Sequence, residues 1–490
     1  MEKNKLSGGA FFDIKGEQSG QPITKKRGVN LLIAIALFII FMLIPMDSIS
    51  PTASPTVALL VAVIYIWITG ALNMGVSCIL LVVGALLLKL INFGTFCTAF
   101  GSSPFAMMIG MFIVSMGASR TNIAKRVAYF FLSRMGNSPA LILLAIITAT
   151  AVISAFVSNL GTTIVMASIS IAIMDEMGEE KGKSGLGKAI MIGIPIASMI
   201  GGMALITGSP STNMMGISML ESITDGAYTV TYNQWAAIGS VCAVLLIIPT
   251  WFVYKKCFHI KNKSGENKVD TAQFKQKLRE LGPMRGAELR WVIIVIFFVG
   301  SMVSGLFPTP VAALFCALLC MLPVIGVVKP EDAMKSLPMD VLILIGFTPV
   351  IADMISGACL GEWLVTNLFG WTIGLPPFVL MLVMALVMTL LINFCANATL
   401  GLIAVVILAF TPLVLASGMN PSLILLPAMF LGSHTTVLGA QTNVVLTYQH
   451  GYWNMKDPIK PGLILMVMWT IVIVVVTYFM GPLIGMPIYI

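Results

Sequence analysis

The sequence predicts an all-α polytopic membrane protein: an inverted repeat of two halves, about 11 transmembrane helices plus two re-entrant helical hairpins, and broken helices at the midplane. Its composition is 58% hydrophobic and only 10% charged, against roughly 25% charged residues in a soluble domain. Long continuous apolar runs exclude a membrane barrel, which needs short alternating strands. The same composition excludes intrinsic disorder and nucleic-acid binding.

The chain begins with a polar tail, residues 1–28, which lacks the short charged start and the cleavage site of a signal peptide. We expect this tail to be cytoplasmic and to lead into a first span at Val29–Pro45. Apolar runs of roughly 20 residues define the other spans, of which several are shorter. These are expected at Thr56–Leu72, Gly75–Ile91, Phe105–Ala118, Leu186–Leu220, Trp235–Tyr254, Trp291–Leu306, Val311–Val328, Val341–Ile355, Leu423–Tyr448 and Pro461–Met480.

Two apolar segments are too long for one crossing and carry a polar run at their centre. Residues 139–177 are interrupted by the sequence from Ser158 to Thr163, and residues 376–416 by the sequence from Asn393 to Thr399. Neither centre carries a charge. We therefore predict two re-entrant hairpins, each of which enters the membrane and returns to the same side.

The distribution of basic residues supports this topology. With the N-terminus inside and both hairpins re-entrant, 27 of the 28 Lys and Arg residues face the cytoplasm, and only Lys89 lies outside. If residues 139–177 crossed the membrane, the ten basic residues between Lys255 and Arg290 would move outside. The same topology places the C-terminus outside.

The two halves, residues 29–258 and 291–490, resemble each other across a cytoplasmic linker at residues 259–290. Each hairpin carries an asparagine at its break, Asn159 and Asn397. Each is followed by a broken span with a Thr-Asn pair, within Gly208–Asn213 and Gly439–Asn443. The hairpins open to opposite sides, so the repeats are inverted. Inverted repeats with paired broken helices indicate a secondary transporter with its site near the midplane.

The chemistry of the breaks favours an uncharged ion cage. Ser, Thr and Asn side chains and freed carbonyls offer neutral oxygens that suit Na⁺, while free N–H groups at half-helix starts attract anions. None of the four breaks contains Asp, Glu, Lys or Arg. Asp353 and His434 are further candidates within the membrane. The alternative for any single polar pair is interhelical packing.

With these motifs the sequence resembles the divalent anion:sodium symporter family, which carries dicarboxylates, citrate or sulfate. Ser158-Asn159 matches the start of the family's Ser-Asn-Thr hairpin motif, and Ser154 matches an upstream serine. The resemblance implies a first sodium site at Ser154, Ser158, Asn159 and Gly208, with Asn159 and Asn397 touching substrate. It also implies a homodimer whose transport domain slides against a fixed scaffold. Leu160, Ala396 and Ala398 depart from the motif by replacing three hydroxyl residues.

Together these observations define the predicted sites. The substrate-binding residues are Asn159, Thr162, Asn213, Asn397, Thr399 and Asn443. A second sodium site is expected at Asn393, Asn397 and Gly439, and no prosthetic group is expected.

The function that this sequence favours is Na⁺-coupled symport of a small dicarboxylate or tricarboxylate by an elevator-type alternating-access mechanism. The alternatives are sodium-independent anion exchange, or transport of sulfate or another anion, on the same fold. An ion channel would not need two inverted hairpins, and a membrane enzyme would need a nucleophile–base or metal cluster that the apolar region lacks. The expected partners are a small anion, the lipid bilayer and a second copy of the chain. The expected location is a bacterial plasma membrane.

Overall fold

The computed structural model describes residues 24–135, 138–260, 271–367, 374–395, 399–434, 436–437 and 441–490. The regular secondary structure within these residues is helical, apart from one isolated bridge between Met419 and Tyr489. Eight of the described helical segments are long and apolar enough to cross a membrane, and several shorter apolar helices accompany them. The observed structure therefore agrees with the all-α class that the composition predicts.

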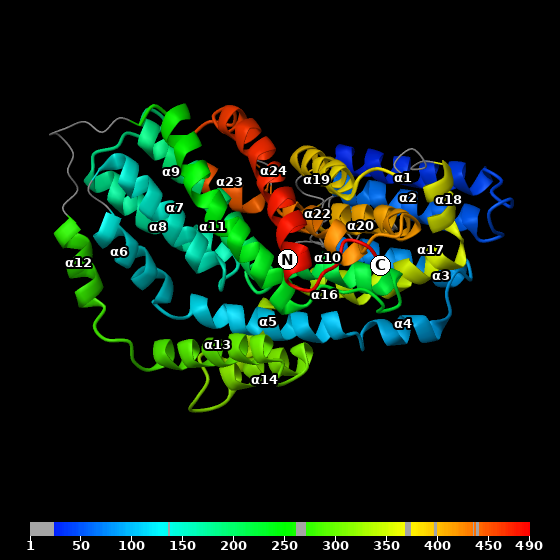
Figure 1. Cartoon of the computed structure of the whole chain (residues 1–490), viewed down its shortest axis with the longest axis horizontal. Coiled ribbons are helices and arrows are strands. Elements are labelled where there is room, and N and C mark those ends of the chain that lie inside the picture. Colours follow the sequence, from blue (N-terminus) through cyan, green and yellow to red (C-terminus); the bar gives the residue numbers. More distant parts are fainter. Residues whose placement is uncertain are drawn as a thin grey trace, which may run out of the picture.

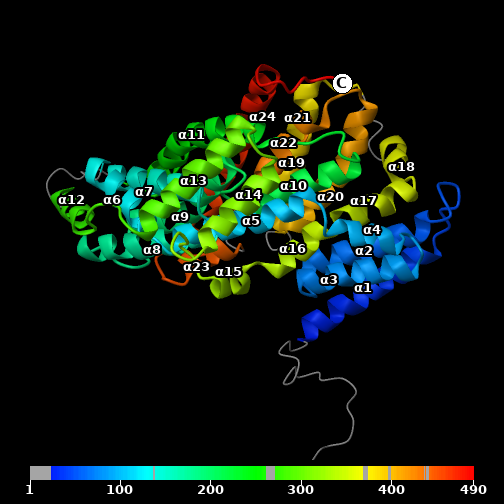
Figure 2. The ribbon, with the colours of Figure 1, turned by 90° about the horizontal axis from the view of Figure 1, so that it is seen from below.

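One end of the molecule is built from three antiparallel helices near the N-terminus (Figure 2). They are α1 (Lys25–Leu43), α2 (Ala53–Thr69) and α3 (Met74–Leu87). Asn73 caps α3 by accepting the backbone N–H groups of Gly75 and Val76. α3 packs against α16 (Met339–Gly346), which belongs to the other half of the chain.

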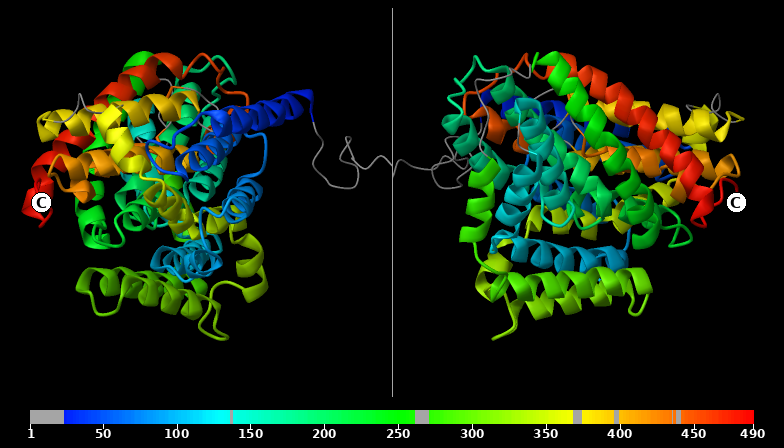
Figure 3. Two further views of the ribbon diagram at one scale, coloured as in Figure 1. Left: turned by 90° about the vertical axis from the view of Figure 1, so that its right-hand side faces the viewer. Right: turned by 60° about the vertical axis from the view of Figure 1, so that its left-hand side comes forward.

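A second group of helices lies along one edge of the molecule (Figures 1 and 3). It consists of α4 (Phe93–Ala99), α5 (Ser103–Ser119), α13 (Ala287–Ser304) and α14 (Thr309–Met321). α5 and α14 approach closely because Gly110 faces the backbone of Ala313, where a Cβ on Gly110 would lie 2.4 Å from the Ala313 carbonyl carbon. α14 is shorter than the predicted span, because Leu322 precedes Pro323 and proline disfavours helical backbone in the residue before it.

The rest of the membrane region contains helices from both halves of the chain. In the first half they are α7 (Pro139–Ser154), α8 (Asn159–Glu176), α9 (Gly185–Ala204), α10 (Pro210–Ile223) and α11 (Tyr232–Cys257). In the second half they are α19 (Pro377–Phe394), α20 (Thr399–Ala416), α21 (Pro421–Ile424), α22 (Leu426–Leu431), α23 (Thr442–Tyr448) and α24 (Ile459–Leu483). α9, whose residues are nearly all buried, packs against α7, α8 and α11, and α11 runs beside α24 (Figure 3).

The expected single span at Val341–Ile355 consists of two helices, α16 and α17 (Thr348–Gly357). Pro349 explains the interruption at Phe347, because its ring fits only the first turn of a new helix. Two further short helices, α15 (Pro330–Ser336) and α18 (Leu360–Asn367), lie on either side of this pair in the sequence.

The linker expected as a polar loop contains a helix, α12 (Thr271–Glu280), which packs on α6 (Ile123–Met135). Arg126 on α6 joins the two regions. Its guanidinium forms a 2.8 Å ion pair with Glu288 and donates to the carbonyls of Leu281 and Gly282. Both partners of the ion pair are largely buried, so removal of either one would leave the other charge buried without its partner and would destabilise the contact between α6 and the start of α13.

Candidate functional site

Four of the described helices begin at the polar breaks that the sequence singles out. In the first half, α7 ends at Ser154 and α8 begins at Asn159, while α9 ends at Ala204 and α10 begins at Pro210. In the second half, α20 begins at Thr399 after the break that follows α19, and α23 begins at Thr442 after the break that follows α22. Each break interrupts an apolar run, so it places backbone polar groups within the membrane region without helical partners.

The starts of these four helices line one cavity of about 500 Å³. Among the described residues, none that lines this cavity is charged. Its polar lining consists of hydroxyl and amide side chains from both halves: Ser158, Asn159, Ser209, Ser211, Thr212, Thr399, Ser433, Gln441, Thr442 and Asn443. The structure therefore brings three of the predicted substrate residues, Asn159, Thr399 and Asn443, to one place.

Three of the four residues expected to form the first sodium site, Ser154, Asn159 and Gly208, lie together. The buried Ser154 hydroxyl donates to Asn159 Oδ1 at 2.8 Å. Gly208 approaches the same point, since a Cβ there would lie 2.7 Å from the Ser154 carbonyl oxygen. Gly202 of α9 faces the Asn159 amide, and a Cβ on Gly202 would lie 2.2 Å from Asn159 Oδ1. This is a compact set of neutral oxygens around the end of the first hairpin.

The tip of the first hairpin, between α7 and α8, is hydrogen-bonded to α5 by a residue that the sequence analysis missed. Ser115 is buried, and its hydroxyl accepts the backbone N–H of Ser158 at 3.1 Å. The Ser158 hydroxyl in turn caps α8 by accepting the N–H of Gly161. A single serine on an apolar helix carries no sequence signal for such a role.

Two predicted substrate residues of the first half lie outside the cavity lining. Asn213 is buried, and its side-chain amide donates to the carbonyls of Gly202, Leu205 and Ile206 at 2.9, 3.1 and 3.3 Å. It thereby satisfies carbonyls that the break in α9 leaves free. Thr162 is also fully buried and does not line the cavity.

In the second half, Asn393 satisfies backbone N–H groups, as Asn213 satisfies backbone carbonyls in the first half. Its Oδ1 accepts the backbone N–H groups of Thr436 and Val437 at 3.0 and 2.9 Å, and its Nδ2 donates to the Thr389 carbonyl at 2.8 Å. The residue is buried, so these contacts are shielded from water. Asn397 and Gly439, the other predicted members of the second sodium site, lie outside the described residues.

We expect Asn393→Ala to destabilise the protein, because it leaves the buried N–H of Thr436 and the partly buried N–H of Val437 unpaired, at a cost of roughly 1–3 kcal/mol for a fully buried group. Thermal unfolding in detergent, followed by tryptophan fluorescence, measures this. Asn454→Ala is the matched control, because Asn454 is exposed in a loop. Equal unfolding temperatures for the two variants would show that Asn393 does not hold the broken segment.

The other two candidates within the membrane do not line the cavity. Asp353 is exposed on α17. His434 is buried with its ring packed edge-on against Trp469 at a centroid distance of 5.1 Å, next to Ser433, which does line the cavity. Within the described part of the chain, no cluster of three or more His, Cys, Asp or Glu residues could hold a metal ion.

Comparison with known protein families decides the class. The model of the sodium:sulfate symporter transmembrane region matches residues 25–486. The chain belongs to this family. The resemblance seen in the hairpin motifs is thereby confirmed, and the chain is an integral membrane transporter and not an enzyme.

The similar proteins agree with this assignment. The sodium-dependent dicarboxylate transporter SdcS of Staphylococcus saprophyticus is 25% identical, over 96% of this chain and 94% of that protein. SdcS of Staphylococcus aureus is 24% identical, over 85% of this chain and 84% of that protein.

Two solved structures share the fold at 13% identity. The Neisseria gonorrhoeae transporter MtrF has a TM-score of 0.57, and the match covers 83% of this chain and 86% of the MtrF chain. Alcanivorax borkumensis YdaH has a TM-score of 0.52, with 79% and 88% covered. The predicted all-α membrane fold is confirmed by these similarities together with the apolar helices.

Proposed function

We propose that this family member couples the inward movement of Na⁺ to the uptake of a small dicarboxylate or tricarboxylate across a bacterial plasma membrane. The observation that carries the proposal is the cavity of about 500 Å³ on which four of the described helix starts converge. Three of the four helices, α8, α10 and α20, have 14 to 18 residues, and each presents roughly half a positive charge and several free N–H groups at its start. The cavity therefore attracts anions although no Lys or Arg among the described residues lines it.

The size of the cavity favours an organic anion over sulfate. Its volume lies within the 300–1,000 Å³ typical of small-molecule sites and leaves room for a carbon skeleton with a carboxylate at each end. The helix starts come from both halves, so each carboxylate can meet a different pair. The name of the relative SdcS, a sodium-dependent dicarboxylate transporter, supports the same substrate class.

Sodium coupling is supported by the uncharged surroundings of the first hairpin. Ser154, Asn159 and the backbone near Gly208 offer neutral oxygens only, so the ion they bind keeps its positive charge and strengthens the field on the anion. Binding of anion and cation is then mutually dependent, as symport requires. Sodium-independent exchange on the same fold remains the second candidate.

Met74 and Pro338 line the cavity at the starts of α3 and α16, which face the cytoplasm in the topology derived from basic residues. We infer from these two residues that the cavity opens toward the cytoplasm. Such an opening corresponds to an inward-facing state with the N-terminus inside and the C-terminus outside. Movement of the hairpins past α5 and α14 in a homodimer would complete an elevator-type cycle.

Substrate uptake by purified protein in liposomes tests this proposal. Under an inward Na⁺ gradient we expect labelled succinate or citrate to accumulate and labelled sulfate to remain at background. Accumulation of sulfate alone would overturn the organic-anion assignment. Each substrate is also tested against an excess of the unlabelled compound, which must block the signal if a saturable site is responsible.

A further inference from the structure

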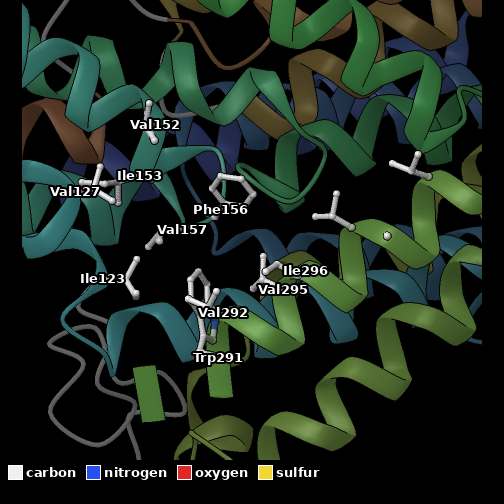
Figure 4. Close-up of a pocket in the computed structure, with 13 residues that line it drawn as sticks. Ile123, Val127, Val152, Ile153, Phe156, Val157, Trp291, Val292, Val295 and Ile296 are labelled. Carbon is white, nitrogen blue, oxygen red and sulfur yellow. The ribbon is translucent and has the colours of Figure 1, made fainter. Parts of the chain in front are cut away.

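An apolar groove of about 610 Å³ lies between the first hairpin and α13 (Figure 4). The hairpin contributes the end of α7 and the residues that follow it, namely Val152, Ile153, Phe156 and Val157. α13 contributes Trp291, Val292, Val295, Ile296, Val299, Gly300 and Val303. Ile123 and Val127 of α6 complete the lining.

The groove offers hydrocarbon and almost nothing else. The only polar side-chain atom among its described lining residues is the indole nitrogen of Trp291, whose N–H already donates to the Val114 carbonyl at 3.0 Å. Water would find no hydrogen-bonding partner in this space. An empty groove would forfeit the dispersion contacts of its walls. Its natural occupant is therefore another hydrocarbon.

The groove also faces the side of α13 that is expected to contact the lipid bilayer. α13 is one of the helices long and apolar enough to cross the membrane, and its groove residues Ile296 and Val303 are 66% and 57% exposed. The groove extends along α13 from Trp291 to Val303, which is about 18 Å at 1.5 Å per residue. Half of a hydrocarbon core of about 30 Å is similar in length, so a single chain from one leaflet fits.

We propose that one acyl chain of a bilayer phospholipid occupies this groove and separates the first hairpin from α13. The groove-lining residues of the hairpin are sequence neighbours of the candidate sodium ligands, because Ile153 and Val157 directly precede Ser154 and Ser158. The acyl chain therefore packs against the hairpin segment that carries the hydroxyl oxygens of Ser154 and Ser158. Under the proposed function, any movement of the hairpin past α13 displaces this chain; the occupancy itself does not depend on that function.

Gly300 makes the groove accessible to a filling substitution. A Cβ at Gly300 would meet no atom within 4 Å, so Gly300→Trp adds an indole to open space instead of a clash. Ile293→Trp is the matched control, because Ile293 lies on the same helix, is 57% exposed and does not line the groove. Both variants place the same side chain on the lipid-facing surface of α13.

Photolabelling in vesicles tests occupancy without requiring transport. The full chain is reconstituted into phosphatidylcholine that carries a diazirine on one acyl chain, irradiated and mapped by mass spectrometry. We expect labels on the peptides of Phe156 and Val295 in the parent protein and in Ile293→Trp. In Gly300→Trp these labels should be lost, while labelling near the exposed Val467 of α24 persists.

Labels that survive Gly300→Trp would overturn the proposal. So would protection of both peptides combined with cross-links to a second copy of the chain, which would identify the groove as a subunit interface. Uptake tests the proposed separation of hairpin and α13: we expect Gly300→Trp to slow it and to leave its Na⁺ dependence unchanged. Equal uptake rates in Gly300→Trp and Ile293→Trp would show that the acyl chain does not affect the movement of the first hairpin.

Discussion

Asn159→Ala is expected to abolish measurable uptake while leaving expression and assembly near normal. Asn159 lines the cavity at the start of α8, and its Oδ1 accepts the buried Ser154 hydroxyl at 2.8 Å. Asn159 is partly buried, and loss of a hydrogen bond to a charged ligand costs roughly 1.5–3 kcal/mol, which corresponds to a reduction of about 10-fold to 150-fold in each binding step that it affects. Initial uptake rates in liposomes, normalised to correctly inserted protein, measure the effect.

The control for this variant is Leu160→Ala, which changes an adjacent cavity-lining residue whose side chain is 44% exposed and apolar. We expect it to retain most of the uptake. If Asn159→Ala misfolds but its folded fraction transports normally, then Asn159 is a packing residue and not a ligand. The sequence makes the same prediction for Asn397→Ala, which lies outside the described residues.

Gly202→Ala is expected to raise the Na⁺ concentration for half-maximal uptake by about tenfold or more, equivalent to about 1.4 kcal/mol of lost binding. Its new Cβ would lie 2.2 Å from Asn159 Oδ1 and 2.9 Å from Asn159 Cγ and Nδ2, so the Asn159 side chain must move from its position in the proposed sodium site. Because the displaced atoms end a side chain, the fold is expected to survive. Uptake measured over a range of Na⁺ concentrations at constant ionic strength shows the shift.

Two other glycines of α9 provide the controls. Gly193→Ala should be tolerated, since its Cβ would meet only side-chain atoms at 3.7 Å. Gly201→Ala should impair folding, because its Cβ would lie 2.0 Å from the backbone oxygen of Ala151 on α7. An unchanged Na⁺ dependence in well-folded Gly202→Ala would remove Asn159 from the sodium site.

The sequence predicts the positions of the helix breaks well, because polar residues within a long apolar segment are costly in a membrane unless they meet polar partners there. The break at Ser158 and the starts of α8, α10, α20 and α23 lie where the polar motifs indicate. Span lengths are predicted less well. The interruption between α16 and α17 and the early end of α14 depend on single prolines, whose effect varies with the surrounding packing.

The sequence could not assign each polar side chain at a break to the ligand or to the backbone. Every break leaves backbone groups that some side chain must satisfy, and composition does not reveal which one does so. The structure assigns Asn213 to the carbonyls around the end of α9 and Asn393 to the N–H groups of Thr436 and Val437. Ser115 could not be found at all, since only tertiary packing places α5 beside the hairpin.

Replacement of Na⁺ by choline tests the central claim of sodium coupling most directly. Proteoliposomes take up the labelled dicarboxylate at fixed pH and fixed membrane potential, with Na⁺ or choline as the external cation. The neutral oxygens around Ser154, Asn159 and Gly208 provide no bound charge to hold the anion without its cation. We therefore predict that uptake falls to background in choline. Uptake that is equal in Na⁺ and in choline would contradict sodium symport and favour sodium-independent exchange.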